Sequence, residues 1–136
     1  MSENQKKIWI TGASSGIGKA VAEKFAAEGW KVAVSARRKE LLQELATNEN
    51  IVSFPLDVTD QNQINTVFKN IISEFGNLDL CLFSSGTYEP KDEKNIDSEK
   101  IKNVIKVNFL GVVDCLKSVE EYFKSRKSGH ISIVSS

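Results

Sequence analysis

Five short apolar runs, separated by longer segments of helical period, constrain the fold of this chain most. The runs span residues 8–10, 32–34, 51–54, 78–83 and 131–134. They are almost continuously apolar, as strands buried on both faces of a sheet are. Parallel neighbours need long connections, and such crossovers are right-handed. The sequence therefore predicts a doubly wound α/β fold, with five parallel strands in the order 3-2-1-4-5 and helices on both faces.

The third and fourth connecting segments give the clearest helical patterns. The third is expected to begin after Thr59 or Asp60 and to end at Gly76, because its apolar residues fall on one helical face. The fourth runs from about residue 97 to 125 and would be ~43 Å long if unbroken. Gly111 is the expected position of a bend in it.

Length and charge limit the classes of protein to consider. With 136 residues, 40% of them hydrophobic, residues 1–136 are expected to form one domain. Lys+Arg and Asp+Glu both number 18 and are scattered, which argues against a nucleic acid or an acidic membrane as partner. No apolar run approaches the roughly 18 residues that a membrane helix needs. The polar N-terminal residues lack the features of a secretory signal, so we expect a cytoplasmic protein.

Two cysteines and one histidine leave little scope for metal or disulfide chemistry. Cys81 and Cys115 are far apart in the sequence and lie among apolar residues, which favours buried free thiols. His130 is the single histidine, so the sequence supplies no zinc ligand set, and no metal site is expected.

A glycine-rich loop follows the first apolar run and opens the first helix. It reads Thr11-Gly12-Ala13-Ser14-Ser15-Gly16-Ile17-Gly18. Glycine permits a tight turn and close approach of a ligand to the main chain, and the helix N-terminus favours a phosphate or pyrophosphate. The alternative is a tight turn with nothing bound, which glycines at this spacing make improbable.

Two other phosphate-binding loops fail on spacing. A nucleotide-hydrolase loop would need glycine and a hydroxyl where Ala13 and Ala20 stand. The G-x-G-x-x-G fingerprint beginning at Gly16 would need glycine in place of Val21.

The loop resembles the signature T-G-x-x-x-G-x-G of the short-chain dehydrogenases/reductases, which Thr11, Gly12, Gly16 and Gly18 satisfy. The resemblance extends over the whole chain and implies the N-terminal, cofactor-binding part of a Rossmann-like NAD(P)-binding domain. It also implies an oxidoreductase that transfers a hydride between nicotinamide and a small-molecule carbonyl or secondary alcohol.

Two further segments resemble the family. Asp57-Val58 matches its adenine-contacting Asp-[Val/Leu], and Phe83-Ser84-Ser85-Gly86 stands where the family reads N-N-A-G, with only the glycine retained. Together with the loop, these segments give the residues expected to bind the cofactor backbone and adenine: Thr11, Gly12, Ser14, Ser15, Gly16, Ile17, Gly18, Asp57, Val58, Ser84, Ser85 and Gly86.

The end of the second strand bears on the choice of nicotinamide cofactor. A site that prefers NAD places a carboxylate there, whereas this chain has Arg37 and Arg38. An arginine pairs with a 2′-phosphate through its planar fork. We therefore expect NADP(H) to be preferred, with Arg37 the stronger candidate, while NAD(H) stays possible. The alternative is that both arginines merely begin a solvated helix.

Asn108 and Ser136 are the expected catalytic residues. Asn108 is the one polar member of an apolar stripe on the fourth helix, so its side-chain amide is expected to be buried and to form hydrogen bonds with a group of the site. The alternative is a core asparagine with a purely structural role, whose hydrogen bonds are satisfied within the core. In the family, the corresponding asparagine helps to place a water in a proton relay. Ser136 matches the serine that bonds the substrate carbonyl oxygen.

The family's Tyr-x-x-x-Lys pair has no counterpart in residues 1–136. We therefore expect these residues to bind cofactor without turnover. Two alternatives are a non-catalytic dinucleotide-binding or redox-sensing module, and a structural domain with an empty loop.

The proposed topology also predicts self-association. The first two helices should cover one face of the sheet and the later two the other, which leaves strands four and five uncovered on the first face. About half of the apolar residues in Leu80–Phe83 and Ile131–Val134 should point there, and strand five would be an open edge. We expect a marginally stable chain that forms homo-oligomers or aggregates, or else the ordered part of a longer protein.

Overall fold

The computed structural model describes residues 4–87 and 95–135 and contains a five-stranded parallel sheet in the order β3-β2-β1-β4-β5. The predicted strand order is confirmed. In chain order the elements are β1 (Lys7–Thr11), α1 (Gly16–Ala27), β2 (Lys31–Ser35), α2 (Lys39–Leu45), β3 (Ile51–Ser53), α3 (Gln61–Phe75), β4 (Leu80–Phe83), α4 (Ser98–Ile105), the π-helical turn η1 (Lys106–Leu110), α5 (Gly111–Arg126) and β5 (His130–Ile133).

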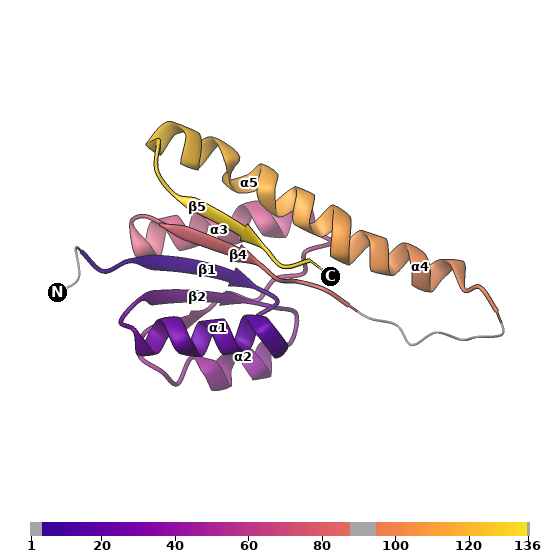
Figure 1. The fold of residues 1–136 in the computed structure, drawn as a ribbon, viewed down its shortest axis with the longest axis horizontal. Helices are drawn as coiled ribbons and strands as arrows, with labels where there is room; N and C mark the ends of the chain where they lie inside the picture. The colour runs from indigo at the N-terminus through magenta and orange to yellow at the C-terminus, as the bar shows by residue number, and fades with distance from the viewer. Residues whose placement is uncertain (1–3, 88–94, 136) are drawn as a thin grey trace.

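The sheet separates two hydrophobic layers (Figure 1). Ile8 and Ile10 of β1 face the layer that contains the buried side chains of α1 and α2. Trp9, between them, faces the layer formed with α3 and α5, because side chains alternate along a strand. The Trp9 indole is fully buried and donates a hydrogen bond of 2.9 Å to the Ser35 hydroxyl. Both faces of β1 and β2 are therefore covered, as their apolar composition requires.

Three strands do not cover the whole of their apolar runs: β3 ends one residue earlier, β4 begins two residues later, and β5 is shifted by one residue. Phe54 and Val134 follow β3 and β5, yet the Phe54 N–H donates to Val34 O at 2.8 Å and the Val134 N–H to Phe83 O at 3.1 Å. Leu78 and Asp79 precede β4, and the Asp79 N–H donates to Lys7 O at 2.9 Å. The apolar runs thus include the residues that flank the regular ladder.

The fourth helical segment is not one regular α-helix. The π-helical turn η1 separates α4 from α5, immediately before Gly111, where the sequence predicted a bend. Gly111 itself has ordinary helical torsions, φ −60° and ψ −40°. A Cβ there would lie 2.9 Å from Val58 Cγ2, so close packing explains this glycine. The α4 helix extends past the carboxyl ends of the strands (Figure 1).

The β5 strand lies at the edge of the sheet and changes the expected apolar patch. Its residues His130 and Ser132 pair with Leu80 and Leu82, on the α1 side of the sheet. Its isoleucines pair with Cys81 and Phe83, which face α3 and α5. The uncovered α1 side of β5 is therefore polar, and the exposed apolar side chains of β5 lie on the other face.

Within residues 4–87 and 95–135, no helix combines the length and the apolar character that crossing a membrane requires.

Candidate functional site

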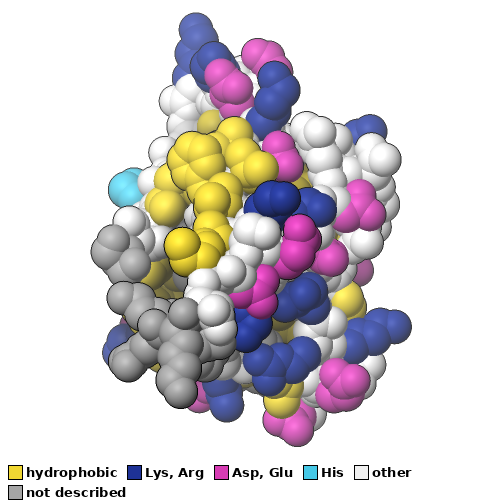
Figure 2. All heavy atoms as spheres, turned by 90° about the vertical axis from the view of Figure 1, so that its right-hand side faces the viewer, with side chains coloured by type: hydrophobic (Ala, Val, Ile, Leu, Met, Phe, Trp, Pro, Cys, Tyr) yellow, Lys and Arg dark blue, Asp and Glu magenta, His cyan; other side chains and the backbone are white. Residues whose placement is uncertain are grey.

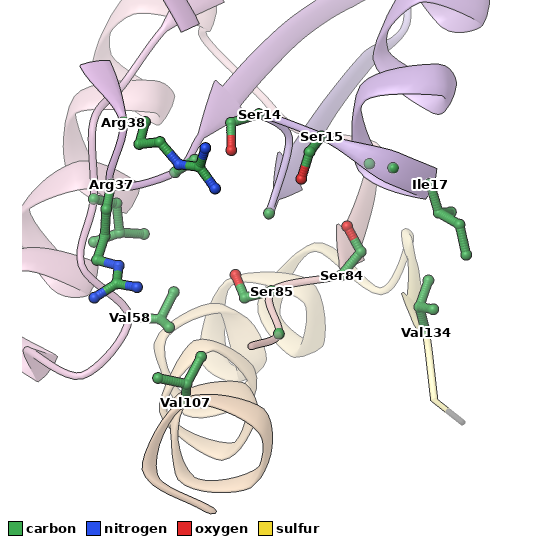
Figure 3. Close-up of a pocket in the computed structure, with 16 residues that line it drawn as sticks. Ser14, Ser15, Ile17, Arg37, Arg38, Val58, Ser84, Ser85, Val107 and Val134 are labelled. Carbon is green, nitrogen blue, oxygen red and sulfur yellow. The ribbon is translucent and has the colours of Figure 1, made fainter. Parts of the chain in front are cut away.

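A pocket of about 290 Å³ lies at the carboxyl ends of the central strands (Figure 3). All the residues expected to bind cofactor line it, except Thr11 and Asp57. Its lining residues are Gly12, Ser14, Ser15, Gly16, Ile17, Gly18, Ala36, Arg37, Arg38, Leu56, Val58, Ser84, Ser85, Gly86, Val107 and Val134. The fold thus brings the loop, the arginine pair and the loop after β4 to one cavity.

Two of the loop glycines allow very close packing. A Cβ on Gly12 would lie 2.5 Å from the Ser84 carbonyl oxygen, and Gly12 has φ +67°. A Cβ on Gly18 would lie within 3 Å of both the Gly12 backbone and Ser84 Oγ. The Ser84 hydroxyl donates a hydrogen bond of 2.6 Å to Thr11 O. These contacts hold the loop after β1 against the loop after β4.

Gly16 has a different environment. It has φ +56°, but a Cβ on it would meet no atom within 4 Å. Its backbone conformation favours glycine, and the space beside it is open to a ligand.

The N-terminus of α1 has features that favour an anionic ligand. The Ser15 side chain makes no capping hydrogen bond, and the first turn of α1 contains no acidic residue. The first amides of a helix lack partners within the helix and carry the positive end of its dipole. The helix therefore presents N–H donors to the pocket, and the loop residues fit a pyrophosphate group.

Arg37 and Arg38 are both exposed and line the pocket. Figure 3 shows the Arg38 guanidinium directed into the pocket on the side of Ser14, whereas Arg37 extends on the side of Val58. Two adjacent guanidinium groups at one end of the pocket favour an anionic ligand there.

Asp57 lies just outside the pocket lining and is held by Thr59. Its Oδ1 atom accepts hydrogen bonds from the Thr59 N–H at 2.9 Å and the Thr59 hydroxyl at 2.7 Å. Partial burial raises the pKa of the Asp57 carboxyl, but these hydrogen bonds and the charges of Arg37 and Lys106 outweigh burial. The pKa of Asp57 is therefore below its usual value.

Thr11 is buried behind the loop and does not line the pocket. Its carbonyl oxygen accepts hydrogen bonds from Ser84, while its hydroxyl has no partner among the residues that the structure describes. Its contact with a ligand stays a prediction.

Asn108 is exposed, and the expectation of a buried side chain was wrong. The π-helical turn changes the helical register, so that Val107 takes the buried position next to it. The Asn108 side chain accepts a hydrogen bond from the Thr87 N–H at 2.7 Å and donates one to Thr87 O at 2.9 Å. Ser136, the other expected catalytic residue, lies outside the described residues.

The sequence reasoning missed four lining residues: Ala36, Leu56, Val107 and Val134. Leu56 and Val58 flank Asp57 in strict alternation, a pattern that could have indicated that both face the cavity. Val107 could not be found this way, because it lies in the π-helical turn, where the regular helical pattern does not apply.

The described residues contain no group of three or more His, Cys, Asp or Glu side chains arranged to hold a metal ion. Cys81 and Cys115 are buried free thiols, as predicted. Burial, together with the charge of Asp114, raises the pKa of the Cys115 thiol to about 12. Burial also raises the pKa of Cys81 well above its usual value. Neither thiol is suited to nucleophilic chemistry at neutral pH.

A glycine loop between β1 and α1, beside the point where the strand order reverses, is typical of dinucleotide-binding α/β proteins. Residues 6–136 match the family model described as short chain dehydrogenase. The chain belongs to the short-chain dehydrogenase family, whose members are NAD(P)-binding oxidoreductases.

Individual relatives agree with this assignment. The chain is 36% identical over 134 residues to Oxidoreductase BOA17 of Botryotinia fuckeliana (strain B05.10), covering 96% of this chain and 49% of that protein. A short-chain dehydrogenase structure from Streptomyces avermitilis has a TM-score of 0.88 and 28% identity, covering 97% of this chain and 49% of that one. The structure of ElxO with NADP bound has a TM-score of 0.87 and 29% identity, covering 97% of this chain and 56% of that one. The chain thus spans about half the length of the relatives it matches.

Proposed function

We propose that residues 1–136 bind NADP(H) as one domain of a short-chain oxidoreductase that transfers a hydride between nicotinamide and a carbonyl or secondary alcohol. The pyrophosphate binds at the glycine loop and the N-terminus of α1. The adenosine half lies toward Val58 and Val107, and Arg37, with Arg38, pairs with the 2′-phosphate. NAD(H) binds more weakly.

The observation that carries this proposal is the meeting of three features in one pocket. They are the open space beside Gly16, the N-terminus of α1 without acidic residues, and the arginine pair after β2. A pyrophosphate and a 2′-phosphate are the anions that such a pocket accommodates together. The NADP in the related ElxO structure supports the same choice.

On the catalytic side, the proposal keeps Asn108 and Ser136 as site residues and gives Asn108 a positioning role. Nicotinamide supplies the hydride chemistry when the cofactor is bound. Asn108 fixes the backbone at Thr87 through two hydrogen bonds, and so contributes to the site by positioning the loop after β4. Ser136 bonds the substrate carbonyl oxygen.

A matched pair of glycine variants tests the proposed binding. Gly16 and Gly29 lie at opposite ends of α1, both have positive φ, and a Cβ on either would meet no atom within 4 Å. Gly16→Asp places a carboxylate in the open space of the pocket, whereas Gly29→Asp adds comparable backbone strain far from it. We expect calorimetry to show NADP(H) binding by the wild type and by Gly29→Asp, and none by Gly16→Asp.

Two results would reject the proposal. One is a wild-type chain that binds neither NADP(H) nor NAD(H). The other is an equal loss of affinity in the two variants, which would mean that strain in α1, and not the loop, controls binding.

A further inference from the structure

The turn η1 links two parts of the site. Val107 is buried and forms part of the pocket wall beside Val58 (Figure 3), whereas the adjacent Asn108 is exposed and bonds Thr87. A π-helical turn changes the direction in which successive side chains project, and such turns are frequent at functional sites. Neighbouring residues of one turn therefore contact the pocket wall and the loop after β4.

Gly111 fixes the position of this turn against Val58. A Cβ on Gly111 would lie 2.9 Å from Val58 Cγ2 and 3.2 Å from Val58 O. The torsions of Gly111 are helical, and alanine is intrinsically the better helix former, so only this contact demands glycine. Val58 is itself 8% exposed and lines the pocket.

At the other side of the turn, Asn108 holds the chain after β4. Both polar atoms of its amide bond the backbone of Thr87. The preceding residue, Gly86, lines the pocket, and a Cβ on it would lie 3.5 Å from Asn108 Oδ1. Any shift of η1 relative to the sheet would therefore move this loop as well as Val107.

We infer that Gly111 is a positioning residue for cofactor binding. Its contact with Val58 sets η1 so that Val107 completes the pocket wall while Asn108 holds Thr87, and η1 couples the two sides of the site. The inference rests on the proposed function, because it takes the adenosine half of NADP(H) as the ligand of the wall formed by Val58 and Val107.

The first test uses 2′,5′-ADP, which represents the adenosine half of the cofactor. Gly111→Ala should raise its dissociation constant roughly tenfold, the scale expected when one methyl group overpacks a tight contact. Val58→Ala removes the atom that the new methyl group meets first. The double variant should therefore bind within about threefold of Val58→Ala alone.

The second test uses Asn108→Ala, because Asn108 is exposed and its replacement should not prevent folding. Asn108 does not line the pocket, yet its loss should weaken 2′,5′-ADP binding severalfold if η1 couples the two sides. In ligand-free protein, the Thr87 amide should exchange its hydrogen faster in Gly111→Ala than in the wild type. A role in folding alone would instead speed the exchange of the protected amides of the sheet as well, and not that of the Thr87 amide in particular.

The outcomes separate the two proposals. A wild-type chain that does not bind 2′,5′-ADP overturns the proposed function and this inference with it. If the wild type binds 2′,5′-ADP and both Gly111→Ala and Asn108→Ala bind it as tightly as the wild type does, this inference alone is overturned. Independent, multiplicative effects of Gly111→Ala and Val58→Ala would also overturn it.

Discussion

Arg37 and Arg38 are adjacent and both exposed, yet their surroundings differ. Arg37 acts electrostatically on Asp57 and lies on the Val58 side of the pocket, whereas Arg38 is the N-cap residue of α2 and points toward Ser14 (Figure 3). The two guanidinium groups therefore reach different parts of the pocket and can be tested separately.

Arg37→Ala should weaken NADP(H) binding selectively. Losing a charge-assisted contact to the 2′-phosphate costs about 1.5 to 3 kcal/mol, or roughly tenfold to a hundredfold in affinity. NAD(H) lacks this phosphate, so its affinity should change little. Calorimetric titration of both cofactors measures the effect. Lys39→Ala is the control, since Lys39 is an exposed cation two residues further on that does not line the pocket.

An equal loss for NADP(H) and NAD(H) in Arg37→Ala would mean that Arg37 does not recognise the 2′-phosphate. The same titration of Arg38→Ala would then show whether Arg38 performs this role.

At the scale of elements, the spacing of apolar residues in the sequence predicted the helices and strands well. The π-helical turn η1 is the exception. The third helix ends before Gly76, which has φ +84°, and Asp60 caps it by accepting from the N–H groups of Asn62 and Gln63. These local signals are visible in the sequence. The turn η1 instead lies next to the close contact between Gly111 and Val58, which joins distant parts of the chain and which no local pattern contains.

Side chains in the C-terminal part of α5 form hydrogen bonds and an ion pair with the two residues that precede β4. Tyr122 Oη accepts a hydrogen bond of 2.9 Å from the N–H of Leu78, a fully buried residue. Arg126 donates to Leu78 O and forms an ion pair of 2.9 Å with Asp79. These bonds satisfy backbone groups just before β4 begins.

Tyr122→Phe should lower the free energy of unfolding by about 1 to 3 kcal/mol, the cost of leaving a buried donor without an acceptor. The aromatic ring keeps its packing against Phe68 and Phe123. Urea unfolding measures the change. Ser118→Ala on the same helix is the control, because the Ser118 hydroxyl only adds a bond to the Cys115 carbonyl within α5. A decrease in the free energy of unfolding no larger than that of Ser118→Ala would mean that the bond between Tyr122 and Leu78 does not stabilise the fold.

At the scale of the molecule, topology explains why most of the candidate site could be predicted. Parallel strands place the loops that follow them at one edge of the sheet, so residues after β1, β2, β3 and β4 converge there although they are far apart in sequence. The environment of Asn108 could not be predicted, because it lies in a π-helical turn, in which Val107 is buried and Asn108 is exposed.

Exposed apolar side chains follow one another along α4, η1 and the start of α5, and another lies on the edge strand: Ile101, Ile105, Phe109, Leu110, Val113 and Ile133. A groove of about 490 Å³ between α5 and β5 is lined by Val113, Leu116, Lys117, Glu120, Phe123, Lys124 and Ile131. Phe109 precedes the lining residue Val113 by four positions, and Ile133 follows the lining residue Ile131 by two. They are 62% and 47% exposed. Figure 2 shows hydrophobic side chains gathered into one area of the surface. Contiguous apolar surface of this kind favours association.

We therefore expect residues 1–136 to self-associate as concentration rises, with β5 adding an edge whose outer backbone groups pair with no strand described in the structure. Sedimentation velocity over a concentration series measures this. Val113→Asp puts a charge at the groove and should shift the chain toward monomer. Ile96→Asp, at a residue that is 87% exposed and outside the groove, should behave as the wild type does. A wild-type monomer at every concentration, or equal effects of the two substitutions, would mean that this surface does not drive association.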